Sequence, residues 1–165
     1  MRKMLCRALV LACSAGAAMP ALATCGASQS SRTPTLRYVI SGATAYDTKT
    51  HLTWQRCSQG QTWSVSGCTG AVRQMSWDET HSWSENWRLP TKDELLTLVA
   101  SECKNPAINE VVFPGMDLKQ PWYWTSTDSN ASWAWAVDLG DGGTSAYAGH
   151  LHAYTLSVRL VRDDR

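Results

Sequence analysis

The 165-residue sequence is poor in charge, with a formal net charge of +1, and it lacks any basic stretch interleaved with aromatic residues. A nucleic-acid partner is therefore not expected, because such partners require a basic surface. Apart from the N-terminal segment, no apolar run approaches the about 20 residues that a membrane helix requires. The sequence shows no repeat of fixed period either. We therefore expect no membrane span and one compact domain.

Cysteine is absent after Cys103, and none of the six cysteines forms a close C-x-x-C pair. The missing pairs disfavour a tetrathiolate zinc site. Two cysteines lie in the N-terminal segment, and the other four indicate disulfides in an oxidising compartment. Of the three possible connectivities we favour Cys57 with Cys68, because the polar residues between them are typical of a long turn. Cys25 then pairs with Cys103.

Residues Met1 to Ala23 have the pattern of a secretory signal peptide. Arg2, Lys3 and Arg7 provide a positive start, Leu5 to Ala18 is rich in apolar and small residues, and Ala21-Leu22-Ala23 provides a small-x-small cleavage site. Lipidation at Cys13 or Cys25 is a weaker alternative, because Cys13 would leave too short an apolar region and Cys25 follows Thr24, where a smaller residue is preferred. The protein is expected to be secreted or periplasmic, and loss of the three basic residues leaves a formal charge of −2.

Helices are predicted only in the middle of the chain. Thr91 is followed by Glu94 three residues later and then by apolar residues, so a capping box begins a helix over Thr91 to Ser101. Ser76 and Glu79 predict a shorter helix over Trp77 to Trp83 in the same way. Strands are predicted toward both ends, over Arg37 to Tyr46, His51 to Arg56, Trp122 to Ser126, Trp133 to Leu139, Ser145 to Gly149 and Leu156 to Arg162. This order indicates an α+β domain over residues 36–165, preceded by an arm at 24–35, with terminal strands that pair.

The order of several short motifs resembles that of the Lcl C-terminal domain family. The matching segments include Leu52-Thr53-Trp54-Gln55-Arg56-Cys57, Trp87-Arg88-Leu89-Pro90-Thr91, Asn105-Pro106-Ala107-Ile108-Asn109, Tyr123-Trp124-Thr125-Ser126 and Val158 to Arg162. The resemblance implies a C-type-lectin-like fold, with two helices, a twisted antiparallel sheet and disulfide staples. The family takes its name from a collagen-like adhesin, which implies adhesion and carbohydrate binding at the bacterial envelope.

The Trp87 to Thr91 segment is also similar to formylglycine-generating enzymes. Those enzymes bind copper through a reactive cysteine pair in their C-terminal part, which this chain lacks after Cys103. A hydrolytic triad of Ser126, Asp138 and His150 is disfavoured as well, because no nucleophile-elbow pattern surrounds the serine. We therefore expect a shared scaffold and no enzymatic activity.

Four residues are weak candidates for metal binding. Asp138 and Asp141 offer the oxygen ligands that calcium accepts, and His150 and His152 offer imidazoles on one face of a strand. The competing interpretation is a tight Asp-Gly-Gly turn beside solvated histidines. Apart from calcium at these residues, no cofactor is expected.

The aromatic residues divide between core and surface. Four are predicted to lie in the core, namely Trp77, Trp87, Trp124 and Trp135. Trp63, in the presumed disulfide loop, and Tyr147 are predicted to be exposed and to contact a ligand, together with Asp128 and Asn130 in a polar loop. Arg159 and Arg162 are expected to close salt bridges at the last strand rather than to bind anions.

These features predict a non-catalytic binding module that recognises a glycan or a cell-surface protein through its loops. The alternative is a structural or protein-interaction subunit of the cell envelope or an appendage, able to form homo-oligomers. A diverged enzyme of the formylglycine-generating type is the third and least favoured interpretation.

Overall fold

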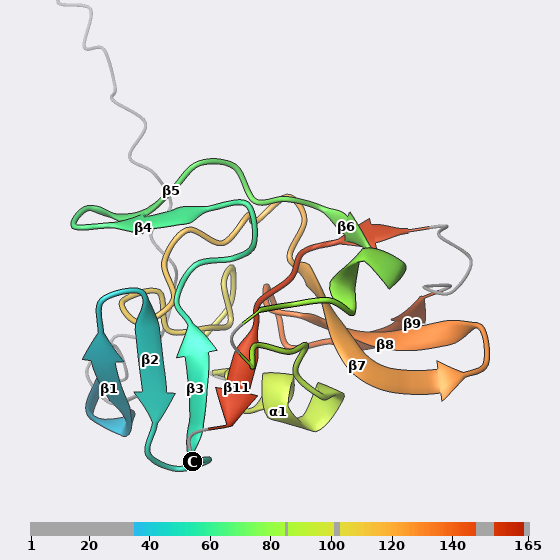
Figure 1. The fold of residues 1–165 in the computed structure, drawn as a ribbon, viewed down its shortest axis with the longest axis horizontal. Coiled ribbons are helices and arrows are strands. Elements are labelled where there is room, and N and C mark those ends of the chain that lie inside the picture. Colours follow the sequence, from blue (N-terminus) through green and yellow to red (C-terminus); the bar gives the residue numbers. More distant parts are fainter. Residues whose placement is uncertain (1–34, 85, 101–102, 148–153, 164–165) are drawn as a thin grey trace, which may run out of the picture.

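The computed structural model describes residues 35–84, 86–100, 103–147 and 154–163. These residues form a mostly β structure with several antiparallel sheets and one short helix (Figure 1). The predicted two-helix, lectin-like arrangement is not evident in them. The predicted signal peptide and most of the predicted arm lie outside the described residues, as do Cys25, His150 and His152.

A four-stranded antiparallel sheet joins the two ends of the domain. Its order is β1 (Tyr38–Ser41), β2 (Thr44–Asp47), β3 (Leu52–Gln55) and β11 (Val161–Asp163). The 3-10 turn η1 (Thr35–Arg37) precedes β1, and Gly42, with a φ of 53°, makes the tight turn between β1 and β2. The pairing of β11 with β3 confirms the prediction of paired terminal strands.

The remaining strands form one three-stranded sheet and two small pairs. The sheet contains β7 (Trp122–Asn130), β8 (Trp133–Asp138) and β9 (Thr144–Tyr147). The pairs are β4 (Thr62–Ser64) with β5 (Gly67–Thr69), and β6 (Met75–Ser76) with β10 (Thr155–Leu156). The single strand predicted over Leu156 to Arg162 is wrong, because Ser157 leaves β10 to pair with Tyr123 before the chain enters β11. In Figure 1 the β4–β5 hairpin and the tip of the β7–β8 hairpin lie toward opposite ends of the long axis.

Both predicted helices are shorter than expected. The capping box at Thr91 is confirmed, since its hydroxyl accepts from Glu94 N at 3.2 Å and the Glu94 carboxylate accepts from Thr91 N at 2.7 Å. However, α1 spans only Lys92–Leu96. After α1, the backbone N–H groups of Thr97, Leu98 and Val99 each donate to the carbonyl of the residue three positions earlier. Val99 then forms a β-bridge with Ile108. The helix predicted after Ser76 is only the 3-10 turn η2 (Asp78–Thr80).

Two apolar clusters lie on either side of β7. Strand alternation sends Tyr123 into a cluster with Trp54, and Trp124 into a second cluster with Trp77. Trp77 and Trp124 are buried as predicted. The prediction was wrong for Trp87 and Trp135, which are half-buried. Lys92 Nζ lies 4.4 Å from the centroid of the Trp135 ring.

Arg88 fastens the Trp87 to Thr91 segment to the end of the chain. Its guanidinium donates to both oxygens of Glu94 at 2.8 Å and to Asp163 at 2.9 Å. Its backbone exchanges two hydrogen bonds with Val161. This motif therefore has a structural role, because it connects α1 to β11.

We expect Glu94→Gln to lower the free energy of unfolding by about 1–2 kcal/mol at pH 7 and by less in acid. Burial alone raises the pKa of Glu94, but the hydrogen bonds from Arg88 and Thr91 outweigh it and hold this pKa below its ordinary value of 4.5. The carboxylate therefore stabilises the fold fully above pH 4.5, and this contribution is lost as the pH falls through the lower, folded-state value. Urea unfolding at pH 7 and at pH 3 measures the difference, with the exposed Asp93→Asn as the control. An equal loss at both pH values would contradict the assignment.

Candidate functional site

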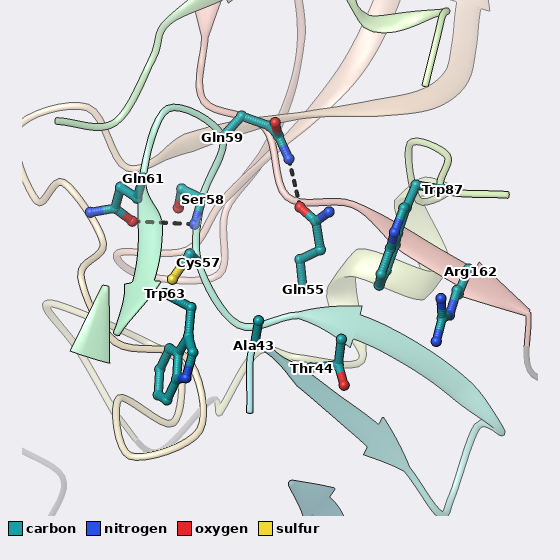
Figure 2. Close-up of a pocket in the computed structure, with 10 residues that line it drawn as sticks. All are labelled: Ala43, Thr44, Gln55, Cys57, Ser58, Gln59, Gln61, Trp63, Trp87 and Arg162. Atoms are coloured by element: carbon teal, nitrogen blue, oxygen red, sulfur yellow. Dashed lines mark hydrogen bonds between the residues drawn. The ribbon is translucent and has the colours of Figure 1, made fainter. Parts of the chain in front are cut away.

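A cleft of about 390 Å³ lies between the β4–β5 hairpin and the end of the four-stranded sheet, where β3 and β11 meet. Figure 2 shows Trp63 at one side of it, Trp87 and Arg162 at the other, and Gln55 and Gln59 between them. The complete lining is Ala43, Thr44, Gln55, Cys57, Ser58, Gln59, Gln61, Trp63, Trp87 and Arg162. No acidic side chain is among these lining residues, and three of them are glutamines.

Trp63 is held over the cleft by a disulfide and by an arginine. The predicted Cys57–Cys68 disulfide is confirmed, and Cys68 faces Trp63 across the β4–β5 hairpin. The Arg56 guanidinium carbon lies 3.8 Å from the centroid of the indole. Its N–H groups donate to three backbone carbonyls, those of Val112 at 2.8 Å and of Gly42 and Val111 at 3.0 Å. Arg56 is therefore a fixed platform for the indole, since each of its three guanidinium nitrogens donates to a backbone carbonyl.

At the opposite side, Arg162 lies over the half-buried Trp87, with its guanidinium carbon 4.8 Å from the ring centroid. No side-chain hydrogen bond or ion pair joins Arg162 to another described residue, so the salt bridge predicted for it stays a prediction. Among the described residues, none occupies its guanidinium N–H donors at the cleft.

The amides in the middle of the cleft are partly paired. Gln59 Nε2 donates to Gln55 Oε1 at 2.6 Å. The side-chain N–H groups of Gln55 and the side-chain Oε1 of Gln59 then have no partner among the described residues. Gln61 is committed to the wall, because its Oε1 accepts from Ser58 N and its Nε2 donates to Gly115 O at 2.9 Å. The cleft thus offers one amide donor group and one amide acceptor to a ligand.

A buried polar cluster lies directly beneath the cleft. Ser58 Oγ hydrogen-bonds with the Tyr123 hydroxyl at 2.7 Å, and Arg159 Nη2 donates to Ser58 Oγ at 3.3 Å. Arg159 Nη1 donates to the carbonyls of Gln55 and Arg56. Arg159 is fully buried, and desolvation lowers its pKa. The described residues do not include the predicted salt-bridge partner, because the groups that this guanidinium contacts among them are carbonyl and hydroxyl oxygens.

Of the four residues predicted to bind a ligand, only Trp63 lines the cleft. Asp128 and Asn130 are exposed near the tip of the β7–β8 hairpin, toward the other end of the molecule (Figure 1). Asn130 Oδ1 accepts from Ser132 N in that turn. Tyr147, on β9, packs its ring edge-on against Trp122, with the centroids 5.3 Å apart. The structure therefore does not bring the four residues together.

The carboxylates suggested as metal ligands have local roles. Asp138 accepts from Gly140 N at 2.6 Å, and Asp141 accepts from Gly143 N at 2.8 Å, so both stabilise their turn. Burial raises the pKa of Asp138. In the part of the chain that the structure describes, no three His, Cys, Asp or Glu side chains gather to hold a metal ion. Because His150 and His152 lie outside that part, calcium binding stays a prediction.

One disulfide lies wholly within the described residues, and a second lies there only in part. The Cys57–Cys68 bond fits an oxidising compartment. Cys103 is buried and disulfide-bonded, but its predicted partner Cys25 is not among the described residues, so that pairing stays a prediction. No helix in the described ranges is long and apolar enough to cross a membrane.

Sequence reasoning missed most of the cleft. Trp87 was assigned to the core, and neither Gln55 nor Gln59 was singled out. The sequence could have indicated Gln55 by its position, since it ends a buried strand directly after the inward-facing Trp54 and alternate strand residues face opposite ways.

The chain matches a known protein family. The model of the Lcl C-terminal domain matches residues 43–162, which include every cleft residue and both cysteines of the Cys57–Cys68 disulfide. No curated protein matches the chain. Since the match covers most of the sequence, the chain belongs to the Lcl C-terminal domain family.

Proposed function

We propose that the protein is a non-catalytic binding module that recognises a glycan in the cleft between Trp63 and Trp87. The observation that carries the proposal is the pair of indoles at the two sides, with unpaired amide groups of Gln55 and Gln59 between them. Sugars present apolar C–H faces and many hydroxyl groups, which suit aromatic surfaces and amides respectively. A cleft of about 390 Å³ is also within the usual range for small-molecule sites.

Each wall has a distinct role in this proposal. Trp63 is already fixed by Arg56 and by the disulfide, so binding orders little and loses little entropy. Arg162 supplies unpaired N–H donors to acceptor oxygens of the sugar. The Gln55 side-chain N–H groups donate to sugar hydroxyl groups, and the Gln59 Oε1 accepts from them. Membership of the family supports a lectin-like relationship, and a secreted or periplasmic location, as parts of the same proposal.

The first test is a glycan and glycosaminoglycan array probed with the oxidised protein, in calcium and again in chelator. We expect saturable binding that Trp63→Ala weakens by about 30-fold, the size typical of a central aromatic contact. Trp133→Ala is the matched control, because Trp133 is 40% exposed on β8, away from the cleft, and its loss should leave affinity unchanged.

Two results would contradict the proposal. Unchanged affinity in the Trp63→Ala variant would place the glycan site elsewhere. Absence of any binding by correctly oxidised protein would favour the protein-interaction alternative. Self-association would then be tested by measuring the molecular mass with size-exclusion chromatography. Loss of binding in chelator would add a calcium requirement.

A further inference from the structure

A second, smaller pocket of about 200 Å³ adjoins the cleft. Trp87 lines both spaces, so this residue is the wall that the cleft and the pocket share. The new pocket adds a third indole, Trp83, together with His81 and Ser126. The lining therefore continues from Trp63 to Trp87 and on to Trp83.

Trp83 is held in place by a hydrogen bond to the turn before it and by packing. Its Nε1 donates to Thr80 O at 2.6 Å, and the Thr80 hydroxyl in turn donates to the Trp77 carbonyl. Trp77 is buried, and its own Nε1 donates to Thr125 O at 3.1 Å. The half-buried Trp83 also packs against the second apolar cluster. Its orientation thus comes from the fold and needs no ligand.

The pocket also has unused polar groups. His81 is exposed, with Nδ1 3.4 Å from Asp78 O and Nε2 without a partner among the described residues. Ser126 is exposed too, its backbone N–H donates to Pro90 O at 2.8 Å, and its hydroxyl has no partner among the described residues. Arg88, by contrast, is committed to Glu94 and Asp163. A hydroxyl and an imidazole beside an indole repeat the aromatic and polar composition of the cleft.

We infer that this pocket is a second sugar subsite, filled by the same ligand that occupies the cleft. The inference rests on the proposed function. It identifies the ligand as a linear oligosaccharide chain that crosses Trp87, with its first units in the cleft and later units against Trp83, His81 and Ser126. A monosaccharide or disaccharide can fill only part of such a site, so affinity must increase with chain length until both subsites are occupied.

The test is a size series of two to eight sugar units, prepared from the polysaccharide that the array identifies, with dissociation constants measured by calorimetry. We expect the native protein to bind the longer chains at least about 10-fold more tightly than the disaccharide, and then to reach a plateau. Trp83→Ala should abolish this gain while leaving disaccharide affinity within about twofold of native. Trp63→Ala should weaken binding of every length.

Trp83→Phe and Ser126→Ala provide milder tests that keep the local packing. Trp83→Phe should retain part of the gain, because an aromatic face remains, and Ser126→Ala should reduce the gain without affecting the disaccharide. Equal affinity for all lengths in the native protein would overturn the second subsite and leave the cleft proposal intact. A length gain that survives both Trp83→Ala and Ser126→Ala would also overturn it. Absence of any array ligand would overturn both.

Discussion

Replacing Arg159 with methionine is expected to lower the free energy of unfolding by about 3–5 kcal/mol, measured by denaturant titration. The guanidinium is fully buried and donates to the carbonyls of Gln55 and Arg56 and to Ser58 Oγ. Methionine fills much of the same volume but cannot donate. The substitution therefore leaves buried acceptors without partners, and each such group costs about 1–3 kcal/mol.

Arg162→Met is the matched control, since the two arginines lie three residues apart. Arg162 is half-buried and only stacks on Trp87, so its loss should change stability by less than about 1 kcal/mol. Arg159→Lys keeps the charge but loses the planar guanidinium. Its free energy of unfolding should lie between those of the native protein and Arg159→Met. Native-like stability of Arg159→Met would show that desolvation of the guanidinium offsets all of its hydrogen bonds.

The features that sequence predicted are those determined by neighbouring residues. The capping box needs only Thr91 and Glu94, and the Cys57–Cys68 bridge closes a short polar loop. The extent of the helix was not predictable in this way. It ends because Val99 pairs with Ile108, and that partner lies beyond the reach of local propensity.

The cleft could not be predicted for a related reason. Its walls come from four separate segments, at Ala43 and Thr44, from Gln55 to Trp63, at Trp87 and at Arg162, and the last of these joins the others only when β11 pairs with β3. A period-two pattern could not separate Arg159 from Arg162 either, because β10 ends at Leu156 and β11 begins only at Val161. One lies beneath the cleft and the other on its wall.

Replacing both Cys57 and Cys68 with serine is expected to lower the free energy of unfolding by about 3 kcal/mol and also to weaken binding at the cleft. The bond joins residues 11 apart in sequence, and closing a loop of this size restricts the unfolded chain by about that amount. The bond also ties Cys68, on β5 opposite Trp63, to Cys57 in the segment that leads into the β4–β5 hairpin. Without it, Arg56 alone must hold the indole, so the hairpin should open more often and affinity should fall more than stability alone explains.

Hydrogen exchange over residues 58–70 separates these two effects, and it requires no ligand. We expect faster exchange in this segment for the double variant, while the β7–β8 amides keep native protection under conditions where the domain remains folded. The double variant is preferable to a reductant, because Cys103 is also disulfide-bonded. Val65→Ser, a change at the fully exposed tip of the same hairpin, should alter neither exchange nor affinity. Native exchange and native affinity in the double variant would mean that Arg56 is sufficient to position Trp63, and that the disulfide stabilises the domain without shaping its cleft.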